Sequence, residues 1–96
     1  EAVASGEYDR GIVMCTTGIG ISIVANKVKG IRCALCSDVT SAKLTRLHND
    51  ANMLSMGAGI IGPNLTMDIV DMFMNTPFSK EEKHVRRLSQ LSEIEK

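Results

Sequence analysis

The segment Gly11-Ile-Val-Met-Cys-Thr-Thr-Gly-Ile-Gly20 constrains the fold of this chain more than any other. Residues 11–15 form an apolar run with the length of a strand buried in a parallel sheet. The Thr/Gly turn that follows leads at once into a helical pattern, so it places a thiol, hydroxyls and backbone N–H groups at a helix N-terminus. Such a corner can bind an anion and lower the pKa of a thiol. The candidate site residues of this corner are Cys15, Thr16, Thr17, Gly18, Ile19 and Gly20.

Two interpretations of this corner remain open on the residue types alone. In the functional one, the cysteine reacts as a thiolate, and the Thr17 hydroxyl donates a hydrogen bond to an oxyanion that forms beside it. In the structural one, a buried cysteine ends a strand before an ordinary Gly-rich turn. The sequence favours neither.

Strand and helix patterns alternate along the chain. We expect strands at 11–15, 31–36 and 52–56, and helices at 18–28, from residue 40 or 41 to 48, at 64–74 and at 79–95. The expected N-caps of the last three helices are Thr40 or Ser41, Asn64 and Ser79. Alternating elements predict βαβ crossovers, and therefore an α/β fold of Rossmann-like, three-layer α/β/α type with a parallel sheet, in a single domain over residues 1–96.

Ligands of such sheets bind beyond the carboxyl ends of the strands. Cys15, the Ser37-Asp38 pair and the loop from Gly57 are therefore expected on one edge of the sheet. His48 ends a crossover helix, so it is expected at the opposite edge or at a contact between subunits.

Composition narrows the possible partners and the compartment. The 96 residues carry 11 basic and 11 acidic side chains, a net charge of zero, so no overall field attracts nucleic acid or an acidic membrane. No apolar run approaches the ~20 residues of a membrane span, and the chain opens without the pattern of a signal peptide. Three cysteines are an odd and sparse set, which favours a reducing, cytoplasmic location. Residues 1–6 are typical of the last turn of a helix, which suggests a fragment.

One cysteine motif and one glycine motif match the spacing of known binding sites, but the other residues that those sites need are missing. Cys33 and Cys36 have Cys-x-x-Cys spacing, but on a strand they point to opposite faces, and no second pair completes a zinc site. The G-x-G-x-x-G match at 57–62 lacks the later strand with an acidic residue that a dinucleotide site needs. We therefore expect a tight strand-to-helix loop at 57–62 and no metal site at Cys33 and Cys36.

The second half of the chain carries the remaining candidate groups. His48 is either a helix C-terminal cation or an acid/base group. The last helix presents four basic residues at i, i+3, i+4 and i+7 spacing: Lys80, Lys83, His84 and Arg87. That face can bind a phosphate, or it can be a solvated face balanced by the neighbouring glutamates.

Taken together, these segments resemble the family of B-type ribose-5-phosphate isomerases and galactose-6-phosphate isomerase subunits. The similarity runs in order through the segments 11–27, 30–38, 48–54, 57–63, 68–71 and 83–87. The resemblance implies an aldose–ketose isomerisation of a phosphorylated sugar, most simply ribose 5-phosphate to ribulose 5-phosphate, through an enediolate and without a cofactor. It also implies a homodimer or homotetramer in which two subunits share each site.

The same resemblance assigns roles to individual residues. Cys15 matches the base that moves the proton between C1 and C2, and Thr17 with nearby N–H groups matches the stabiliser of the enediolate oxygen. His48 matches the residue that assists ring opening, which it would do for the Cys15 of a partner subunit. Asn49 matches a sugar contact. Arg87, with Lys83, matches the phosphate clamp, so the last helix is expected to serve as an arm for the dimer and the phosphate site.

The sequence also departs from the family pattern. Thr16 stands where a glycine is usual, and Gly59 where a basic residue is usual. Glu81-Glu82-Lys83-His84 replaces Gly-Gly-Arg-His, which weakens the clamp. An N-terminal strand–helix–strand–helix unit of roughly 50 residues has no counterpart, so the chain matches the C-terminal two thirds of the family, and little activity is expected from it alone. Two other functions remain open: a phosphocysteine carrier domain of a sugar phosphotransferase system, and a non-catalytic remnant that binds sugar phosphate.

Overall fold

The computed structural model describes residue 3 and residues 8–95. These residues contain seven helices and strands. In chain order they are β1 (Gly11–Cys15), α1 (Ile19–Asn26), β2 (Cys33–Leu35), α2 (Val39–Asn49), β3 (Met53–Gly57), α3 (Pro63–Asn75) and α4 (Glu82–Glu95). The helix end expected at residues 1–6 lies outside the described residues, apart from residue 3. No helix within residues 8–95 is long and apolar enough to cross a membrane.

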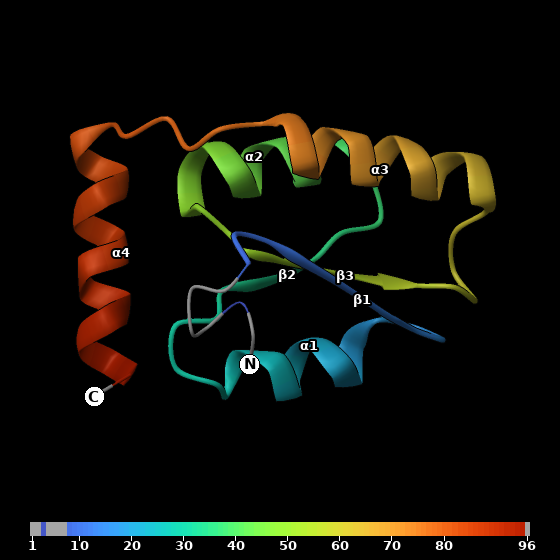
Figure 1. The fold of residues 1–96 in the computed structure, drawn as a ribbon, viewed down its shortest axis with the longest axis horizontal. Coiled ribbons are helices and arrows are strands. Elements are labelled where there is room, and N and C mark those ends of the chain that lie inside the picture. The colour runs from blue at the N-terminus through green and yellow to red at the C-terminus, as the bar shows by residue number, and fades with distance from the viewer. Residues whose placement is uncertain (1–2, 4–7, 96) are drawn as a thin grey trace.

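The strands form one parallel sheet in the order β1-β3-β2. Their register pairs Cys15 with Gly57, so β1 and β3 end at the same level. Figure 1 shows α1 on one face of the sheet and α2 with α3 on the other. The expected three-layer α/β/α fold is thereby confirmed, including the parallel sheet and the helices on both faces. We call the edge at Cys15 and Gly57 the carboxyl edge, and the edge where the strands begin the amino edge.

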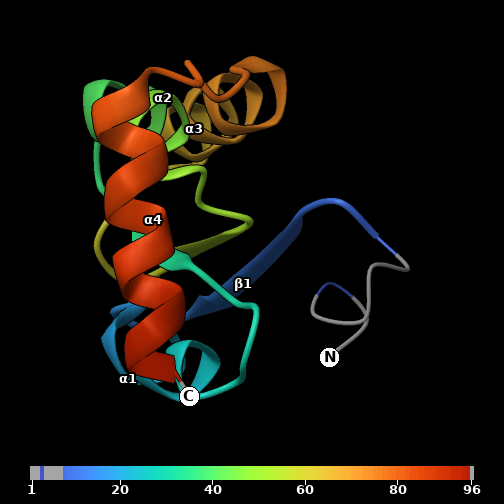
Figure 2. The same ribbon diagram turned by 90° about the vertical axis from the view of Figure 1, so that its left-hand side faces the viewer.

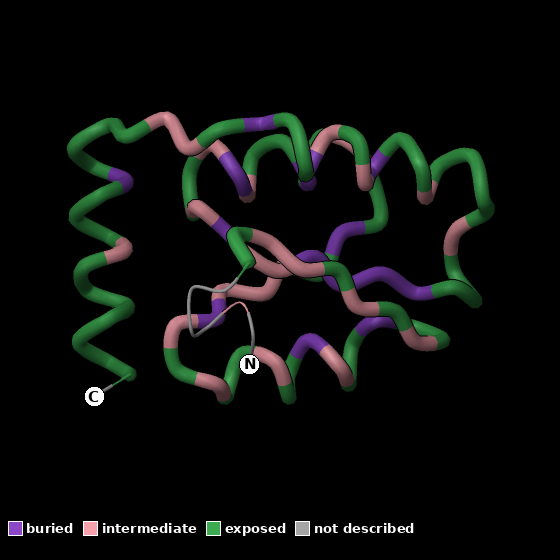
Figure 3. The backbone as a smooth tube through the Cα atoms, in the orientation of Figure 1, coloured by how far each residue is buried: buried purple, intermediate pink, exposed green. Residues whose placement is uncertain are grey.

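The core lies between the central strand and the two helices above it. Leu54 and Met56 of β3 point to this side and pack against Ile69 and Phe73 of α3 and Ala42 of α2, all fully buried. Figure 3 shows this burial along β3 and along the inner sides of α2 and α3. Because a strand alternates its side chains, Ser55 points to the other face, where its hydroxyl donates to the Gly18 carbonyl of the loop before α1.

Three expected N-caps are wrong. Asp38, in an extended conformation, caps α2, and its carboxylate accepts the N–H of Ser41 at 2.9 Å, so Ser41 is a capping partner and not the cap. Gly62 precedes α3, because Pro63 lacks an N–H and suits the first helical position better than Asn64 suits the cap. Ser79 lies before α4, whose first turn instead hydrogen-bonds the Glu81 carbonyl.

Two elements are shorter than expected, and one apolar pattern faces solvent. α1 ends at Asn26, and β2 covers only Cys33–Leu35. The apolar residues of α1 at helical spacing, Ile19, Ile23 and Val24, are 52%, 56% and 64% exposed. The side of α1 toward the sheet instead carries the buried Ser22, which bonds the Ile19 carbonyl.

The last helix stands apart from the layers. Figures 1 and 2 show α4 running across the edge of all three layers, from the level of α2 and α3 toward that of α1. Its first turns contact α2, and near its end the Glu95 carboxylate lies 3.4 Å from the N–H of Gly30. Between these two contacts a groove lies between the helix and β2, lined by Cys33 and Ala34 of the strand and by Leu91 and Ile94 of the helix.

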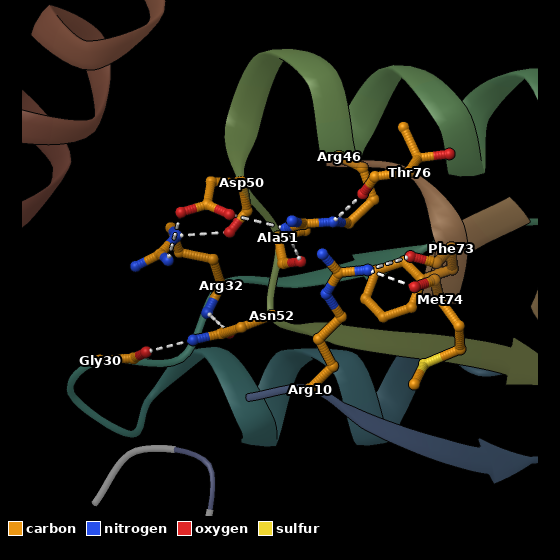
Figure 4. Close-up of polar contacts among 10 residues, drawn as sticks. All are labelled: Arg10, Gly30, Arg32, Arg46, Asp50, Ala51, Asn52, Phe73, Met74 and Thr76. Atoms are coloured by element: carbon orange, nitrogen blue, oxygen red, sulfur yellow. Dashed lines mark hydrogen bonds and ion pairs between the residues drawn. The ribbon is translucent and has the colours of Figure 1, made fainter. Parts of the chain in front are cut away.

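Arginines hold the amino edge together (Figure 4). Arg46 of α2 is 4% exposed and donates to the carbonyls of Thr76 and Ala51, at 2.9 and 2.8 Å, and to the Asp50 carboxylate at 2.7 Å. Arg32 reaches the same carboxylate from the other side at 3.5 Å. A third arginine, Arg10, donates to the carbonyls of Phe73 and Met74 at the end of α3. The ends of α2 and α3 are thus fixed at this edge.

Candidate functional site

The first candidate group is the cysteine at the end of β1. The N–H of Gly18 donates to Cys15 Sγ across 3.0 Å, which lowers the pKa of the thiol, and the threonine at 17 adds weaker hydrogen bonds. Partial burial opposes this shift without cancelling it. The geometry therefore makes Cys15 easier to ionise than a free thiol, at the N-terminus of α1.

Glycines allow this turn to form. Gly18 has φ +80°, and a Cβ there would lie 2.8 Å from the Met56 carbonyl carbon. A Cβ on Gly57 would lie 2.5 to 2.7 Å from three backbone atoms of Thr17, closer than Cβ atoms approach backbone in proteins. The end of β3 and the cysteine loop are therefore in direct backbone contact, and this contact positions Thr17.

The loop at 57–62 supports the cysteine loop from behind. Ala58 N–H donates to the Cys15 carbonyl at 2.7 Å, and Gly59 N–H donates to the Thr16 carbonyl at 2.8 Å. A Cβ on Gly59 would lie 2.9 Å from the methyl group of Thr16. The G-x-G-x-x-G match is thus a tight strand-to-helix connection, as expected.

The other residues of the corner surround the thiol on its open side. Thr16, Thr17, Ile19 and Gly20 are all exposed. The Thr17 hydroxyl accepts the N–H of Ile19 at 3.2 Å and also hydrogen-bonds the Cys15 thiol weakly. Nothing lies within 4 Å of a Cβ built on Gly20, so the first turn of α1 is open to an approaching group.

The second candidate group lies at the opposite edge. α2 runs back from the carboxyl edge, so His48 and Asn49 at its end lie at the amino edge, beside α4 and away from the arrowhead of β1 (Figure 1). His48 therefore lies where its position on a crossover helix predicts. Within one chain, the structure does not bring His48 or Asn49 together with Cys15.

The basic residues of the last segment diverge. Lys83 and Arg87 lie one turn apart on α4 and are exposed, with Lys83 Nζ 3.7 Å from the Glu81 carboxylate. Lys80 lies before the helix with φ +61°, so it does not share their face. His84 is not on a solvated face either: it is 5% exposed, and its ring centroid lies 4.4 Å from that of His48.

Residues not assigned to the site from sequence also meet here. The Ser79 hydroxyl lies 2.9 Å from His84 Nδ1, and the buried ring of His84 lies against the exposed ring of His48. Asn49 lines a groove of about 410 Å³ between α4 and the sheet, together with Arg32 and the apolar Leu91 and Ile94. The sequence predicted His84 on a basic face with Lys80, Lys83 and Arg87, and nothing in the sequence paired it with His48.

The remaining cysteines differ from Cys15. Burial raises the pKa of Cys36 to about 11, with the Asp38 charge adding to the effect, and Cys36 packs in the core against the α2 and α3 side. Burial also raises the pKa of Cys33, which lines the groove beside α4. The two side chains lie on different faces, as the Cys-x-x-Cys spacing on a strand predicts. Neither resembles a reactive thiol.

Known proteins similar to this chain agree on its family. The model of the ribose/galactose isomerase family matches residues 1–91. YwlF of Bacillus subtilis is 54% identical over 95 residues, 99% of this chain and 63% of YwlF. Ribose-5-phosphate isomerase B of Escherichia coli is 45% identical, over 98% of this chain and 62% of that protein. The chain therefore spans somewhat under two thirds of the length of these relatives.

Solved structures agree, while the named substrates of relatives vary. The structure of Clostridium thermocellum ribose-5-phosphate isomerase B superposes with a TM-score of 0.94 at 50% identity, over 98% of this chain and 63% of that one. A relative in Pectobacterium atrosepticum, 46% identical over 77 residues (80% of this chain, 51% of that protein), is named D-erythrulose-4-phosphate isomerase. Since the family model covers nearly the whole chain, the chain belongs to the ribose/galactose isomerase family.

Proposed function

We propose that the protein to which this chain belongs interconverts an aldose phosphate and a ketose phosphate, with Cys15 as the base. The observation that carries this proposal is the 3.0 Å hydrogen bond from Gly18 N–H to Cys15 Sγ at an open helix N-terminus. In the proposed reaction the thiolate takes the proton from C2 of the open-chain aldose, and the electron pair moves to O1 to give an enediolate. The O2 hydroxyl proton then passes to O1, and the thiol returns its proton to C1, so that C2–O2 becomes the carbonyl of the ketose and the thiolate is restored.

The groups around Cys15 suit the other needs of this reaction. The Thr17 hydroxyl and the loop N–H groups lie beside the thiol and hydrogen-bond it, so the same donors are close to where the negative charge of the enediolate would develop. The open first turn of α1, at Ile19 and Gly20, admits the sugar. Ribose 5-phosphate is the proposed substrate, because the relatives most similar over the whole chain include enzymes named for it.

Two copies of the chain are proposed to share each site. His48, Asn49, Lys83 and Arg87 belong to the amino edge, and Cys15 to the carboxyl edge, so one chain does not offer both groups to one sugar. The apolar residues of α1 beside Cys15 are exposed, which is typical of a surface that is buried in an interface with another subunit. We propose that His48 assists ring opening in the site of a partner subunit, where Lys83 and Arg87 bind the phosphate.

The primary test is turnover of ribose 5-phosphate by the protein as its gene encodes it. Cys15→Ala is expected to lower kcat by about 10²- to 10⁴-fold, the usual contribution of a positioned base. Cys33→Ala is the matched control and is expected to leave kcat unchanged. Normal turnover by Cys15→Ala would exclude this cysteine as the base. Acid-labile phosphate on Cys15 would instead indicate a phosphocarrier, and binding without turnover a non-catalytic protein.

Mixing two inactive variants tests whether the site is shared. A random mixture of Cys15→Ala and His48→Ala subunits contains mixed dimers in which one of the two sites is intact, so about a quarter of the wild-type activity should return. If the groups instead acted within one chain, the mixture would stay inactive.

The phosphate clamp has its own matched pair. Arg87→Ala is expected to raise KM for ribose 5-phosphate by about tenfold, because a guanidinium is well suited to bind phosphate. Arg86→Ala removes the same charge from the next position, on another side of α4, and is expected to change KM little. Equal effects of both variants would assign the arginines a general electrostatic role.

A further inference from the structure

The end of α2 and the segment that leads into α4 are joined at successive residues. Arg46 Nε donates to the Thr76 carbonyl at 2.9 Å, and three residues later in that segment Ser79 N–H donates to the Leu47 carbonyl at 3.1 Å. His84 then lies with its ring centroid 4.4 Å from that of His48. Three consecutive residues of α2 thus contact three successive points of the segment 76–84. His48 is the last of these three residues.

Ser79 is the central residue of this arrangement. Its N–H bonds α2 one residue before His48, and its hydroxyl lies 2.9 Å from Nδ1 of His84. The same hydroxyl oxygen accepts the N–H of Glu81 at 3.3 Å, and the hydroxyl proton can be directed at Nδ1. A neutral His84 ring that accepts at Nδ1 carries its proton on Nε2. Ser79 therefore holds the ring of His84 at Nδ1, and donation from its hydroxyl would select the Nε2–H tautomer.

The surroundings of His84 favour the neutral ring. Burial lowers the pKa of His84, and the His48 ring of α2 adds to this effect. On α4, the charges of Lys83 and Arg87 lower it further, and only Glu81 opposes them. The aromatic ring of Phe78 closes the far side, 6.5 Å away. A neutral and buried imidazole is a suitable flat surface on which the exposed His48 can rest.

We propose that His84, held by Ser79, is a positioning residue that supports the ring of His48 and fixes the direction in which His48 faces its substrate. This inference rests on the proposed role of His48 in ring opening, and it adds a residue that does not itself touch the sugar. An unsupported histidine on the last turn of a helix would sample several rotamers. A misplacement of about 1 Å in a reacting group can cost as much as 100-fold in rate, so this support should be visible in kcat.

The test compares three variants of the protein as its gene encodes it. His84→Ala removes the supporting ring and is expected to lower kcat for ribose 5-phosphate by about 10- to 100-fold, with little change in KM. His84→Phe keeps a flat ring in the same place and should restore most of kcat. Val85→Ala, at the exposed neighbour on α4, is the matched control and should behave as the wild type. A rise in KM with unchanged kcat would overturn the proposal, because His84 would then act through the phosphate site. Equal loss in His84→Ala and His84→Phe would also overturn it.

A second measurement does not depend on activity. NMR of the imidazole groups should show the Nε2–H tautomer for His84 and a ring-current shift of the His48 Hε1 proton. Ser79→Ala should disturb the tautomer, and His84→Ala, but not His84→Phe, should abolish the shift. If the wild-type protein leaves ribose 5-phosphate unchanged, the proposed function fails, and the NMR comparison still decides whether His84 supports His48. An unshifted His48 in the wild type would overturn the inference itself.

Discussion

The two edges of the sheet are built in different ways. At the carboxyl edge, backbone meets backbone: the loops after β1 and β3 touch through Gly57 and are joined by the N–H groups of Ala58 and Gly59. At the amino edge, long side chains span the gaps: Arg46 and Arg32 meet at Asp50, and His84 supports His48. Small residues are needed at the first edge, and long polar ones at the second.

This difference indicates what each edge can do. The carboxyl edge presents N–H groups and the Cys15 thiol at positions fixed by the backbone, so no long side chain has to be ordered. Fixed donors of this kind are suited to stabilise a developing negative charge. A side-chain network presents cations and imidazoles that project away from the body, which suits a role at another subunit. The following predictions test this contrast, in order of decreasing effect.

Loss of the buried arginine should have the largest effect on stability. Arg46→Met removes the donor to Thr76, Ala51 and Asp50, and it leaves buried acceptors unpaired, so the free energy of unfolding should fall by about 3–5 kcal/mol. Urea unfolding followed by circular dichroism measures it. Lys43→Met, an exposed change on the same helix, is the control and should cost less than about 0.5 kcal/mol. Equal effects would mean that side chains do not hold the amino edge.

A single methyl group should disrupt the carboxyl edge. Gly57→Ala would place a Cβ 2.5 Å from backbone of Thr17, so the loops must separate, at a cost of about 1–3 kcal/mol in unfolding free energy. Gly20→Ala is the matched control, since nothing lies within 4 Å of that Cβ, and it should be neutral or stabilise α1 by about 0.5–1 kcal/mol. A neutral Gly57→Ala would show that this contact is not tight.

The three thiols should separate by reactivity. The lowered pKa of Cys15 means that its thiolate forms at lower pH than that of a free thiol, so iodoacetamide should label it at neutral pH at least tenfold faster than Cys36. Peptide mass spectrometry of native protein, over a series of pH values, measures each rate. In denaturant all three should react alike, which is the control. Faster labelling of Cys33 than of Cys15 would contradict an activated thiol at the carboxyl edge.

The smallest effect is expected at a backbone position before α4. Lys80 has φ +61°, so Lys80→Gly should relieve backbone strain in the folded state. Glycine also has more conformational freedom in the unfolded chain, which offsets part of this gain. The free energy of unfolding should therefore rise by less than about 1 kcal/mol. Asp50→Gly, at φ +47°, is the contrasting change and should destabilise, because it removes the partner of Arg46. Thermal unfolding of both variants distinguishes backbone strain from side-chain contact.

Local patterns were sufficient for much of the fold. The strand at 11–15, the alternation of strands and helices, and the three-layer parallel sheet were all predicted, because each depends on runs of five to about fifteen residues. The caps at Asp38 and Gly62 were missed, since Thr40, Ser41 and Asn64 are equally good cap residues locally. Backbone conformation, set by packing, decided between them.

The corner at Cys15 was predicted for the same local reason. The strand, the turn and the helix that form it are contiguous, so the hydrogen bond from Gly18 follows from sequence order. The backbone contact with Gly57 lies 40 positions further along, and only the pairing of β1 with β3 brings it there.

By itself, the sequence determined the class of fold, the strand–turn–helix corner at Cys15 and the resemblance to the isomerase family, because these features depend on neighbours along the chain. Only the tertiary structure decided that Arg46 is buried among carbonyls and that His84 supports His48. Those contacts join residues 30 and 36 positions apart. Partners at such separations leave no periodic signal in a single sequence, since what selects them is the packing of α2, the segment before α4 and α4 against one another.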